Sequence, residues 1–411
     1  MRKDTSSASF SIKKYGPQEK SDAYRPDVGN GLRPDGTPVT GNDRYDTSEV
    51  ADPPFVAAWV RQMAQEFPRL FEEHRIMFSL GNEPMLWNVT HRDVHPNPVS
   101  YDEYLARFIA MAHAVREAAP GAAITGPELW GWPAYFQSAL DRETKTDRDR
   151  ASHGGEAFLP WFLKQLKAHE DRTGERLLDI VTVHFYPQAE GVHSAAVDLN
   201  ATTLRIETTR SLFDPTYRDP SWINARVRLI PQLQRWVAQC YPGLKTGITE
   251  YNWGGEADIS GALALADVLG IFGREGLDLA CYWTYPPEGS LAASAYALYR
   301  NADGHGAAFG DVRLAVNWTV PADVRERLSV YAARDGERKI VTLIVLNKSA
   351  LTQSLQIDFK GIDLLPGNEY RVGDRGDGIE AVQEPVVVQR HGFRCVLAPR
   401  SICHLRFPEK S

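Results

Sequence analysis

Ile76-Met77-Phe78-Ser79-Leu80-Gly81-Asn82-Glu83-Pro84 is a short apolar run that ends in a glutamate and a proline. The pattern predicts a buried strand, because the run is too short for a typical helix and is bounded by Gly and Pro. Pro84 removes a backbone donor and keeps the residue before it out of the helical region, so the strand should end there. Glu83 is therefore expected at the carboxyl end of a strand.

A second run has the same form, Leu244-Lys245-Thr246-Gly247-Ile248-Thr249-Glu250-Tyr251. In a barrel of parallel strands, the groups that act on a substrate lie at the carboxyl ends of the strands. We therefore expect Glu83 and Glu250 at one edge of a sheet. Two facing carboxylates are the groups that hydrolysis of a glycosidic bond requires.

Strands and helices alternate along most of the chain. Strands are predicted at 8–13, 76–80, 123–126, 180–186, 244–249 and 277–283, and helices at 53–67, 101–118, 156–169, 224–239 and 261–272. Such repeated units imply a parallel sheet, doubly wound or closed as a barrel. No Gly-rich phosphate motif follows a strand, which disfavours a nucleotide-binding sheet. The favoured fold is a (β/α)8 TIM-type barrel, although only six of its eight strands are found.

After about residue 310 the pattern changes to short strands separated by turns. They are predicted at 328–333, 339–346, 355–359, 386–389, 393–397 and 402–407. Asp335-Gly336 is a good hairpin turn between the first two. We therefore expect an α/β barrel domain over residues 1–310 and an all-β sandwich over residues 311–411.

The composition is that of an ordinary globular protein. The chain has 411 residues, 43% of them hydrophobic and 24% charged, with a net charge of −7. This charge disfavours a nucleic-acid partner, and no apolar stretch approaches the ~20 residues of a membrane span. The four cysteines form no CxxC pair, so no zinc site is expected. The first seven residues have no apolar core of the kind a signal peptide needs.

Polar and aromatic side chains accompany the two glutamates. His184 and Tyr186 have the period-2 spacing that puts both on one side of a strand, where they can bond sugar hydroxyls and the carboxylates. A phenol or amide donor beside Glu250, such as Tyr251, would favour its ionised form. A lone strand histidine is more often structural, so His184 stays open between the two readings.

Several tryptophans fall just after strands or at their ends. An indole can stack on the apolar face of a pyranose ring and still donate a hydrogen bond. The candidates for substrate contact are Trp87, Trp130, Trp253 and Trp283. His91, Asp93 and His95 lie on the loop after the first glutamate, but their alternating spacing is not a recognised metal pattern. We expect that loop to shape the rim of the site and predict no metal ligands.

Taken together, these residues resemble glycoside hydrolase family 44. The resemblance is carried by the stretches Ser11–Gln18, Gly31–Asp43, Asn82–Trp87, Thr90–Pro96, Thr249–Asn252 and Tyr299–Gly304. It implies a barrel with a β-sandwich, endo-action on β-1,4-glucan or xyloglucan and a secreted, monomeric enzyme without a cofactor; a structural Ca²⁺ stays open. It assigns the acid/base role to Glu83, the nucleophile role to Glu250 and contact with the sugar 2-hydroxyl to Asn82, with His184 and Tyr186 lining the cleft.

Two departures from the family pattern leave alternatives open. Gly81 stands where a larger polar residue is expected. If residue 8 opens strand three, the family would place about a hundred further residues, two βα units, ahead of Met1. The alternatives are a non-catalytic carbohydrate-binding fragment and a related retaining xylanase or mannanase.

Overall fold

The computed structural model describes residues 8–373, 378–389 and 391–410. The chain forms two compact units, one of Met1–Phe185 with Gln234–Thr249 and the other of Tyr186–Leu233 with Glu250–Ser411. The predicted domain boundary at residue 310 stays a prediction. The absence of a signal peptide was predicted from residues 1–7, which lie outside the described part.

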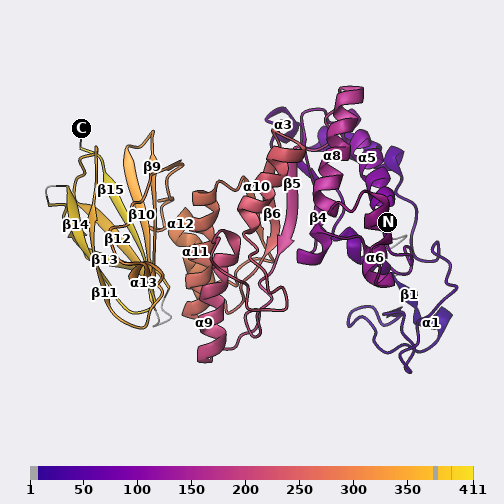
Figure 1. The fold of residues 1–411 in the computed structure, drawn as a ribbon, viewed down its shortest axis with the longest axis horizontal. Helices are drawn as coiled ribbons and strands as arrows, with labels where there is room; N and C mark the ends of the chain where they lie inside the picture. Colours follow the sequence, from indigo (N-terminus) through magenta and orange to yellow (C-terminus); the bar gives the residue numbers. More distant parts are fainter. Residues whose placement is uncertain (1–7, 374–377, 390, 411) are drawn as a thin grey trace. The chain divides into compact units, whose positions relative to one another are not determined.

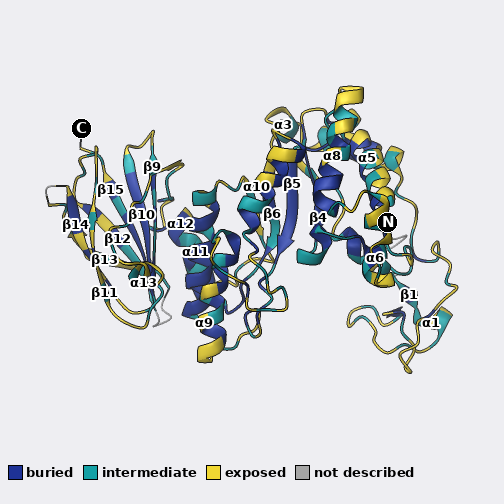
Figure 2. Ribbon diagram, in the orientation of Figure 1, coloured by how far each residue is buried: buried dark blue, intermediate teal, exposed yellow. Residues whose placement is uncertain are grey.

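Parallel strands form the sheet that carries the site (Figure 1). The strands are β3 (Met77–Ser79), β4 (Ala123–Leu129), β5 (Ile180–Phe185), β6 (Lys245–Tyr251) and β7 (Leu279–Tyr282), in that order across the sheet. In the first unit, β3 pairs with β4 and β4 with β5 in parallel register. Every residue of β5 is buried, as is typical of a central strand in a parallel sheet (dark blue in Figure 2). Its two polar residues, Thr182 and His184, alternate with apolar ones.

The predicted strand at 8–13 is wrong. Only β1 (Phe10–Ser11) is extended there, and it pairs antiparallel with β2 (Val28–Gly29) outside the parallel sheet. The physical reason is a helix cap. The Ser11 side chain accepts a hydrogen bond from the Lys14 backbone N–H and starts the short helix α1 (Ile12–Tyr15). Five parallel strands are therefore described instead of six.

Helices of the first unit alternate with these strands. They are α2 (Pro53–Glu66), α3 (Pro68–Glu72), α4 (Trp87–Thr90), α5 (Tyr101–Ala118), α6 (Ala139–Thr144), α7 (Arg148–Ser152) and α8 (Phe158–Thr173). Ser100 caps the start of helix α5, because its side chain accepts a hydrogen bond from the Glu103 N–H. Its buried residues include Tyr104, Phe108 and Ala112, one helical turn apart.

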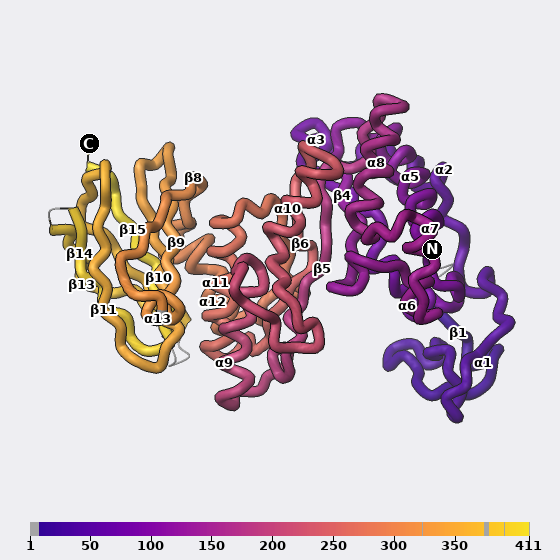
Figure 3. Tube along the Cα trace, viewed as in Figure 1, coloured from indigo at the N-terminus to yellow at the C-terminus, as the bar shows by residue number. Residues whose placement is uncertain are grey.

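A long irregular segment, residues 16–52, holds the short strand β2 (Figure 3). Arg92 fixes it from the loop after α4, because its guanidinium donates to the Val39 and Gly31 carbonyls. Asn42 donates to the Asp93 carbonyl across the same contact, at 2.8 Å. The long loop is thus tied to the rim loop that follows Glu83.

The second unit begins with helices around a buried one. They are α9 (Leu199–Glu207), α11 (Ile259–Glu275) and α12 (Leu291–Arg300), and α10 (Leu229–Cys240) runs from this unit into the first. Residues Ile259–Val268 of α11 are all buried, and apart from Ser260 and Asp267 they are apolar or glycine, as is typical of a helix covered on all sides. In the described part of the chain, no helix combines the length and the apolar character needed to cross a membrane.

The C-terminal part is a β-sandwich of antiparallel sheets. A six-stranded sheet has the order β13-β12-β15-β10-β9-β8, and β11 pairs with β14. The strands are β8 (Val312–Arg313), β9 (Leu328–Asp335), β10 (Ile340–Asn347), β11 (Gln353–Asp358), β12 (Gly367–Val372), β13 (Glu380–Val386), β14 (Gly392–Leu397) and β15 (Ser401–Pro408), and α13 (Ala322–Arg325) precedes β9. The core joins both sheets through Leu343, Leu355 and Phe393. The predicted fold class, a TIM-like α/β fold with a β-sandwich, is confirmed.

Candidate active site

Glu83 lies in the turn after β3, directly before the short 3-10 helix η1 (Pro84–Leu86). Its backbone is left-handed, with φ 47° and ψ 55°, rather than extended as expected. A non-glycine residue in this region is uncommon and is held there by its surroundings. Here the Glu83 N–H donates to the Glu128 carbonyl at 3.0 Å, which fixes the turn to β4.

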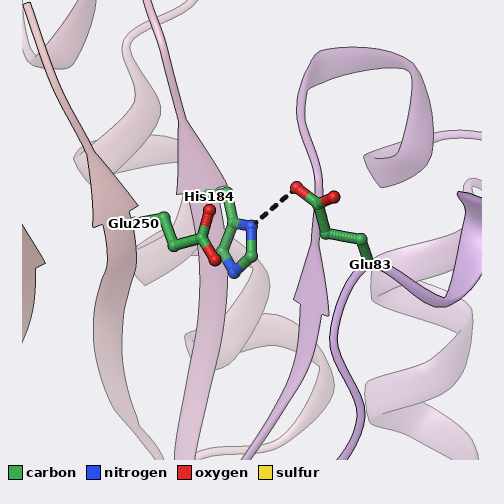
Figure 4. Close-up of side chains that lie close together, drawn as sticks. All are labelled: Glu83, His184 and Glu250. Carbon is green, nitrogen blue, oxygen red and sulfur yellow. Dashed lines mark hydrogen bonds and ion pairs between the residues drawn. The ribbon is translucent and has the colours of Figure 1, made fainter. Parts of the chain in front are cut away.

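His184, on β5, is buried and contacts the Glu83 side chain. Its Nδ1 lies 3.0 Å from Glu83 Oε1 (Figure 4, dashed line). The Glu83 side chain is 24% exposed, so one carboxylate is held by the protein and still reaches solvent. The backbone of β5 is itself held at this point, since Tyr135 donates its hydroxyl to the His184 carbonyl at 2.5 Å.

A third glutamate, Glu128, was not predicted. It stands on β4 where the register with β5 is irregular, between Pro127 and Leu129, and its φ is 54°. Such a bulge re-aims a side chain, and bulges are frequent beside active sites. Glu128 is 2% exposed. The signal in the sequence was an apolar run that ends in a glutamate, the pattern that identified Glu83, but Gly126-Pro127 was taken as the strand's end.

Donors from four strands surround the Glu128 carboxylate. Oε1 accepts from Ser79 at 2.7 Å, Thr125 at 2.9 Å and Thr182 at 2.6 Å. Oε2 accepts from Thr249 and lies 3.5 Å from His184 Nε2. Burial alone raises the pKa of Glu128, but the hydrogen bonds from His184 and the hydroxyls outweigh it and lower the pKa to about 2.

Glu250, in the second unit, is the next residue after Thr249 and lies on the last part of β6. The Tyr186 hydroxyl donates to Glu250 Oε2 at 2.9 Å. The sequence left open whether His184 and Tyr186 contact the carboxylates. In the structure His184 contacts Glu83 and Tyr186 contacts Glu250. A donated hydrogen bond favours the charged form of a carboxylate.

Asn82 and Trp87 belong to one local arrangement around Glu83. Asn82 is exposed, and its carbonyl accepts from the Trp87 indole N–H at 2.9 Å. The Trp87 ring meets His95 and Tyr104 edge-on. Trp87 thus fixes the loop that carries Glu83, whereas its contact with a sugar stays a prediction.

Trp130 follows β4 and is partly buried. The Arg142 guanidinium lies over its ring, 5.7 Å from the centroid. The indole nitrogen of Trp130 is buried and has no hydrogen-bond partner among the described residues. Its contact with a sugar also stays a prediction.

The expectation that Tyr251 and Trp253 contact substrate is not supported. Tyr251 is 1% exposed and Trp253 2% exposed. Side chains alternate along a strand, so Tyr251 points away from the side of Glu250 and packs against Phe272. The indole of Trp253 donates to Thr208 at 3.2 Å in the interior of the second unit. Both residues belong to the core.

Two tryptophans of the second unit offer open faces. Trp283, predicted at the rim, is 52% exposed, and its carbonyl accepts from the Asn252 side chain at 2.7 Å. Trp222 was not predicted, because it lies in a loop far from any strand end. It is 58% exposed and donates to Gln188, which in turn donates to the Tyr186 carbonyl at 2.8 Å. Trp222 is thus connected to the residue that holds Glu250.

The loop after α4 does not assemble metal ligands. His95 Nε2 lies 2.8 Å from Glu103 Oε1, and Asp93 contributes its carbonyl to the contact with Asn42. Within the described residues, His91, Asp93 and His95 form no group that could hold an ion. His95 packs edge-on against Trp87 beside Glu83, whereas the role of the loop in shaping the rim of the site stays a prediction.

The arrangement supplies groups for proton transfer and for nucleophilic attack. Glu83 is a partly exposed carboxyl in contact with an imidazole, which suits a group that gives and takes a proton. Glu250 is a carboxylate that accepts from a phenol, which suits a group that must stay ionised. The exposed indoles Trp222 and Trp283 provide apolar faces of the kind that sugar rings contact.

Comparison with known proteins gives the family. Residues 1–189 match the model of glycoside hydrolase family 44. The solved structure of CelM2, a bifunctional glucanase-xylanase protein from a metagenome library, matches with a TM-score of 0.91 and 36% identity, over 98% of this chain and 78% of that one. The chain belongs to glycoside hydrolase family 44. The resemblance to family 44 found in the sequence is confirmed.

Two further proteins are similar to the chain. Endoglucanase A of Paenibacillus lautus is 37% identical over 282 residues, 66% of this chain. The chain spans 39% of the length of that protein. A Paenibacillus polymyxa xyloglucanase of family 44, solved with xyloglucan, matches with a TM-score of 0.77 and 28% identity, over 86% of this chain and 70% of that one. Both of these relatives are named as enzymes that act on β-linked glucans.

Proposed function

We propose that the chain is a retaining endo-β-1,4-glucanase in which Glu83 is the general acid/base and Glu250 the nucleophile. The observation that carries the proposal is the different partner of each glutamate. Glu83 contacts the imidazole of His184, a group that can share a proton. Glu250 accepts from the phenol of Tyr186, a group that stabilises an anion. Different surroundings for two carboxyls are what an acid and a nucleophile require.

Chain connectivity supports a common site for the two glutamates. His184 and Tyr186 are two residues apart, and each contacts one of them. Thr249 donates to Glu128, and Glu250 follows it with a Cα–Cα step of about 3.8 Å. We therefore propose that the two carboxyl groups face each other across the scissile bond, about 5–5.5 Å apart as in retaining glycosidases.

The reaction then has two steps. Glu250 attacks the anomeric carbon while Glu83 gives its proton to the leaving oxygen, and a glycosyl-enzyme forms. Glu83, now a carboxylate, takes a proton from water, and the water oxygen attacks the anomeric carbon. The bond to Glu250 breaks, and the sugar leaves with its original anomeric configuration. Every proton and electron pair is supplied by the two glutamates and water, so we propose that no cofactor takes part.

The test of the nucleophile is Glu250→Ala. It should lower kcat on soluble β-1,4-glucan by at least about 10⁴-fold, and azide should restore part of the rate as a glycosyl azide of inverted configuration. Glu117→Ala is the control, because Glu117 is an exposed glutamate paired only on the surface with Arg61. Full activity of Glu250→Ala without azide, or an inverted product from the unmodified chain, would refute the assignment.

The polymer is the finer part of the proposal. We propose a β-linked, uncharged glucan or xyloglucan, because the exposed indoles suit unsubstituted ring faces and the family includes a xyloglucanase. The likeness to CelM2, named as a glucanase-xylanase, makes xylan the second candidate. Product analysis with glucan, xyloglucan, xylan and mannan oligosaccharides distinguishes these. Binding to cellulose without release of any product would instead identify a carbohydrate-binding fragment.

The proposed substrate bears on where the enzyme acts, and the family resemblance implies a monomer. A polymer of this size lies outside cells, so we propose that the enzyme acts there as a monomer, with neither nucleic acid nor membrane as a partner. Size-exclusion chromatography with light scattering tests the oligomeric state. A stable dimer would overturn that part of the proposal without affecting the chemistry.

A further inference from the structure

We infer that Glu128 is a positioning residue for the acid/base step: its buried negative charge keeps a proton on His184 Nε2, so that His184 Nδ1 shares one proton with Glu83. The inference rests on the proposed role of Glu83. It adds a third carboxylate, one that never meets the substrate. All three residues belong to the first unit, so the argument uses contacts inside one compact body.

Glu128 is built to remain an anion. Three hydroxyls donate to Oε1 and a fourth to Oε2, and a protonated carboxyl could not accept all of them as well. A buried charge without such partners would be costly. The donors come from β3, β4, β5 and β6, so the charge is held where the strands that carry the site end.

This anion decides which nitrogen of His184 carries the proton. Nε2 lies 3.5 Å from Glu128 Oε2. A lone pair on Nε2 would face the negative charge, whereas an N–H is attracted to it. The partner of one ring nitrogen therefore sets the state of the other. With Nε2 protonated, neutral His184 presents the Nδ1 lone pair to Glu83 Oε1, 3.0 Å away.

Glu83 and His184 then hold one exchangeable proton between them. It lies on the carboxyl when Glu83 is poised as an acid, with Nδ1 as acceptor. The same proton can lie on Nδ1 and donate to the carboxylate, and the charge on Glu128 then stabilises the imidazolium. When Glu83 gives this proton to the leaving oxygen, the pair has none until Glu83 takes a proton from water in the second step. The other titratable groups of this unit at this place are Tyr104 and Tyr135, and burial raises the pKa of both phenols. They stay neutral, so within the first unit Glu128 supplies the fixed charge. The other carboxylate drawn beside His184 in Figure 4 is that of Glu250, and a change at Glu128 leaves it in place.

The experiment is Glu128→Gln in the full chain, measured as the pH dependence of kcat/KM. On a cello-oligosaccharide, whose leaving group needs a proton, the basic limb should move about one pH unit lower, because the pair has lost the charge that retains its proton. On 2,4-dinitrophenyl β-cellobioside, whose leaving group needs none, the rate of glycosyl-enzyme formation should change less than about 3-fold. Glu128→Asp, which keeps the charge, should restore part of the basic limb.

Asp267→Asn is the matched control. Asp267 is also 2% exposed and also accepts from hydroxyls, those of Thr209 and Tyr331, but it lies in the second unit on α11. Its loss should lower the melting temperature and leave the basic limb in place. If the basic limb of the pH profile stays in place in Glu128→Gln, Glu128 only supports the fold. The same holds if the variant loses an equal fraction of its rate on both substrates.

A measurement without a Glu128 variant protects the test against misfolding. The ¹⁵N shifts of His184, assigned by comparison with His184→Asn, should show the proton on Nε2 between about pH 6 and 8. A proton on Nδ1 with Nε2 bare would overturn the inference. Activity retained by Glu83→Ala and Glu250→Ala would instead refute the proposed function. If both of those inactivate the enzyme and the limb still does not move, only the role of Glu128 fails.

Discussion

Tyr186 is the residue that distinguishes Glu250 from an ordinary strand-end glutamate. Its hydroxyl donates to Oε2 at 2.9 Å. We expect Tyr186→Phe to lower kcat/KM about 10- to 100-fold, because a hydrogen bond to a charged group contributes about 1.5–3 kcal/mol. The melting temperature should change little, since the ring remains. Tyr24→Phe is the control, because Tyr24 is almost fully exposed. Equal kinetics for the two variants would show that Tyr186 does not act on Glu250.

At this scale the sequence placed His184 and Tyr186 on one side of a strand, because strand geometry fixes period-2 neighbours, and it left their contacts with the carboxylates open. In the structure each of them contacts a glutamate. The same rule, applied one residue further, would have placed Tyr251 in the core. The apolar run before Glu128 was a signal for a strand-end glutamate, but the burial of its carboxylate could not be predicted, because it depends on a bulge and on hydroxyls from three other strands. No local pattern in the sequence records such a set of donors.

Among the elements, helix α5 has the bounds that were predicted, Tyr101–Ala118. A cap and a continuous apolar stripe define it locally. Ser100→Ala should destabilise the first unit by about 1 kcal/mol, because the Glu103 N–H loses its acceptor. Urea unfolding followed by circular dichroism measures this. Ser100→Thr, which keeps the hydroxyl, should stay near the unmodified stability, and a loss as large as that of alanine would contradict the capping role.

Elements that depend on distant contacts were predicted less well. Strand β4 continues through Gly126-Pro127 to Leu129, because pairing with β5 holds it extended beyond a dipeptide that usually ends a strand. The segment 8–13 has the composition of a strand, but Asp27 accepts from Ser11 and from the Lys13 N–H and holds it in a turn. Tertiary context decided both cases.

For the whole molecule, the first group expected to limit stability as the pH falls is His404 in the β-sandwich. Burial lowers the pKa of His404 to about 4, and its Nδ1 contacts the Leu298 carbonyl. The unfolded chain binds this proton below about pH 6.5 and the folded chain only below about pH 4, so stability is lost as the pH falls between these values. At pH 5.5 the loss should be about 1.4 kcal/mol.

Urea unfolding at pH 7.5 and pH 5.5 measures this loss. His404→Gln can still donate to the Leu298 carbonyl but does not titrate, so its stability should differ less between the two pH values. An unchanged pH dependence in this variant would place the acid sensitivity elsewhere.

The left-handed turn at Glu83 bears on how an intact polysaccharide could be trapped for crystallography. Any inactive replacement at this position must accept a φ of 47° before the proline. Asparagine and glycine tolerate that conformation, whereas a β-branched residue would force the loop to open. A trapped complex made with asparagine should therefore keep the natural shape of the cleft, and one made with valine would show a cleft that the working enzyme never has.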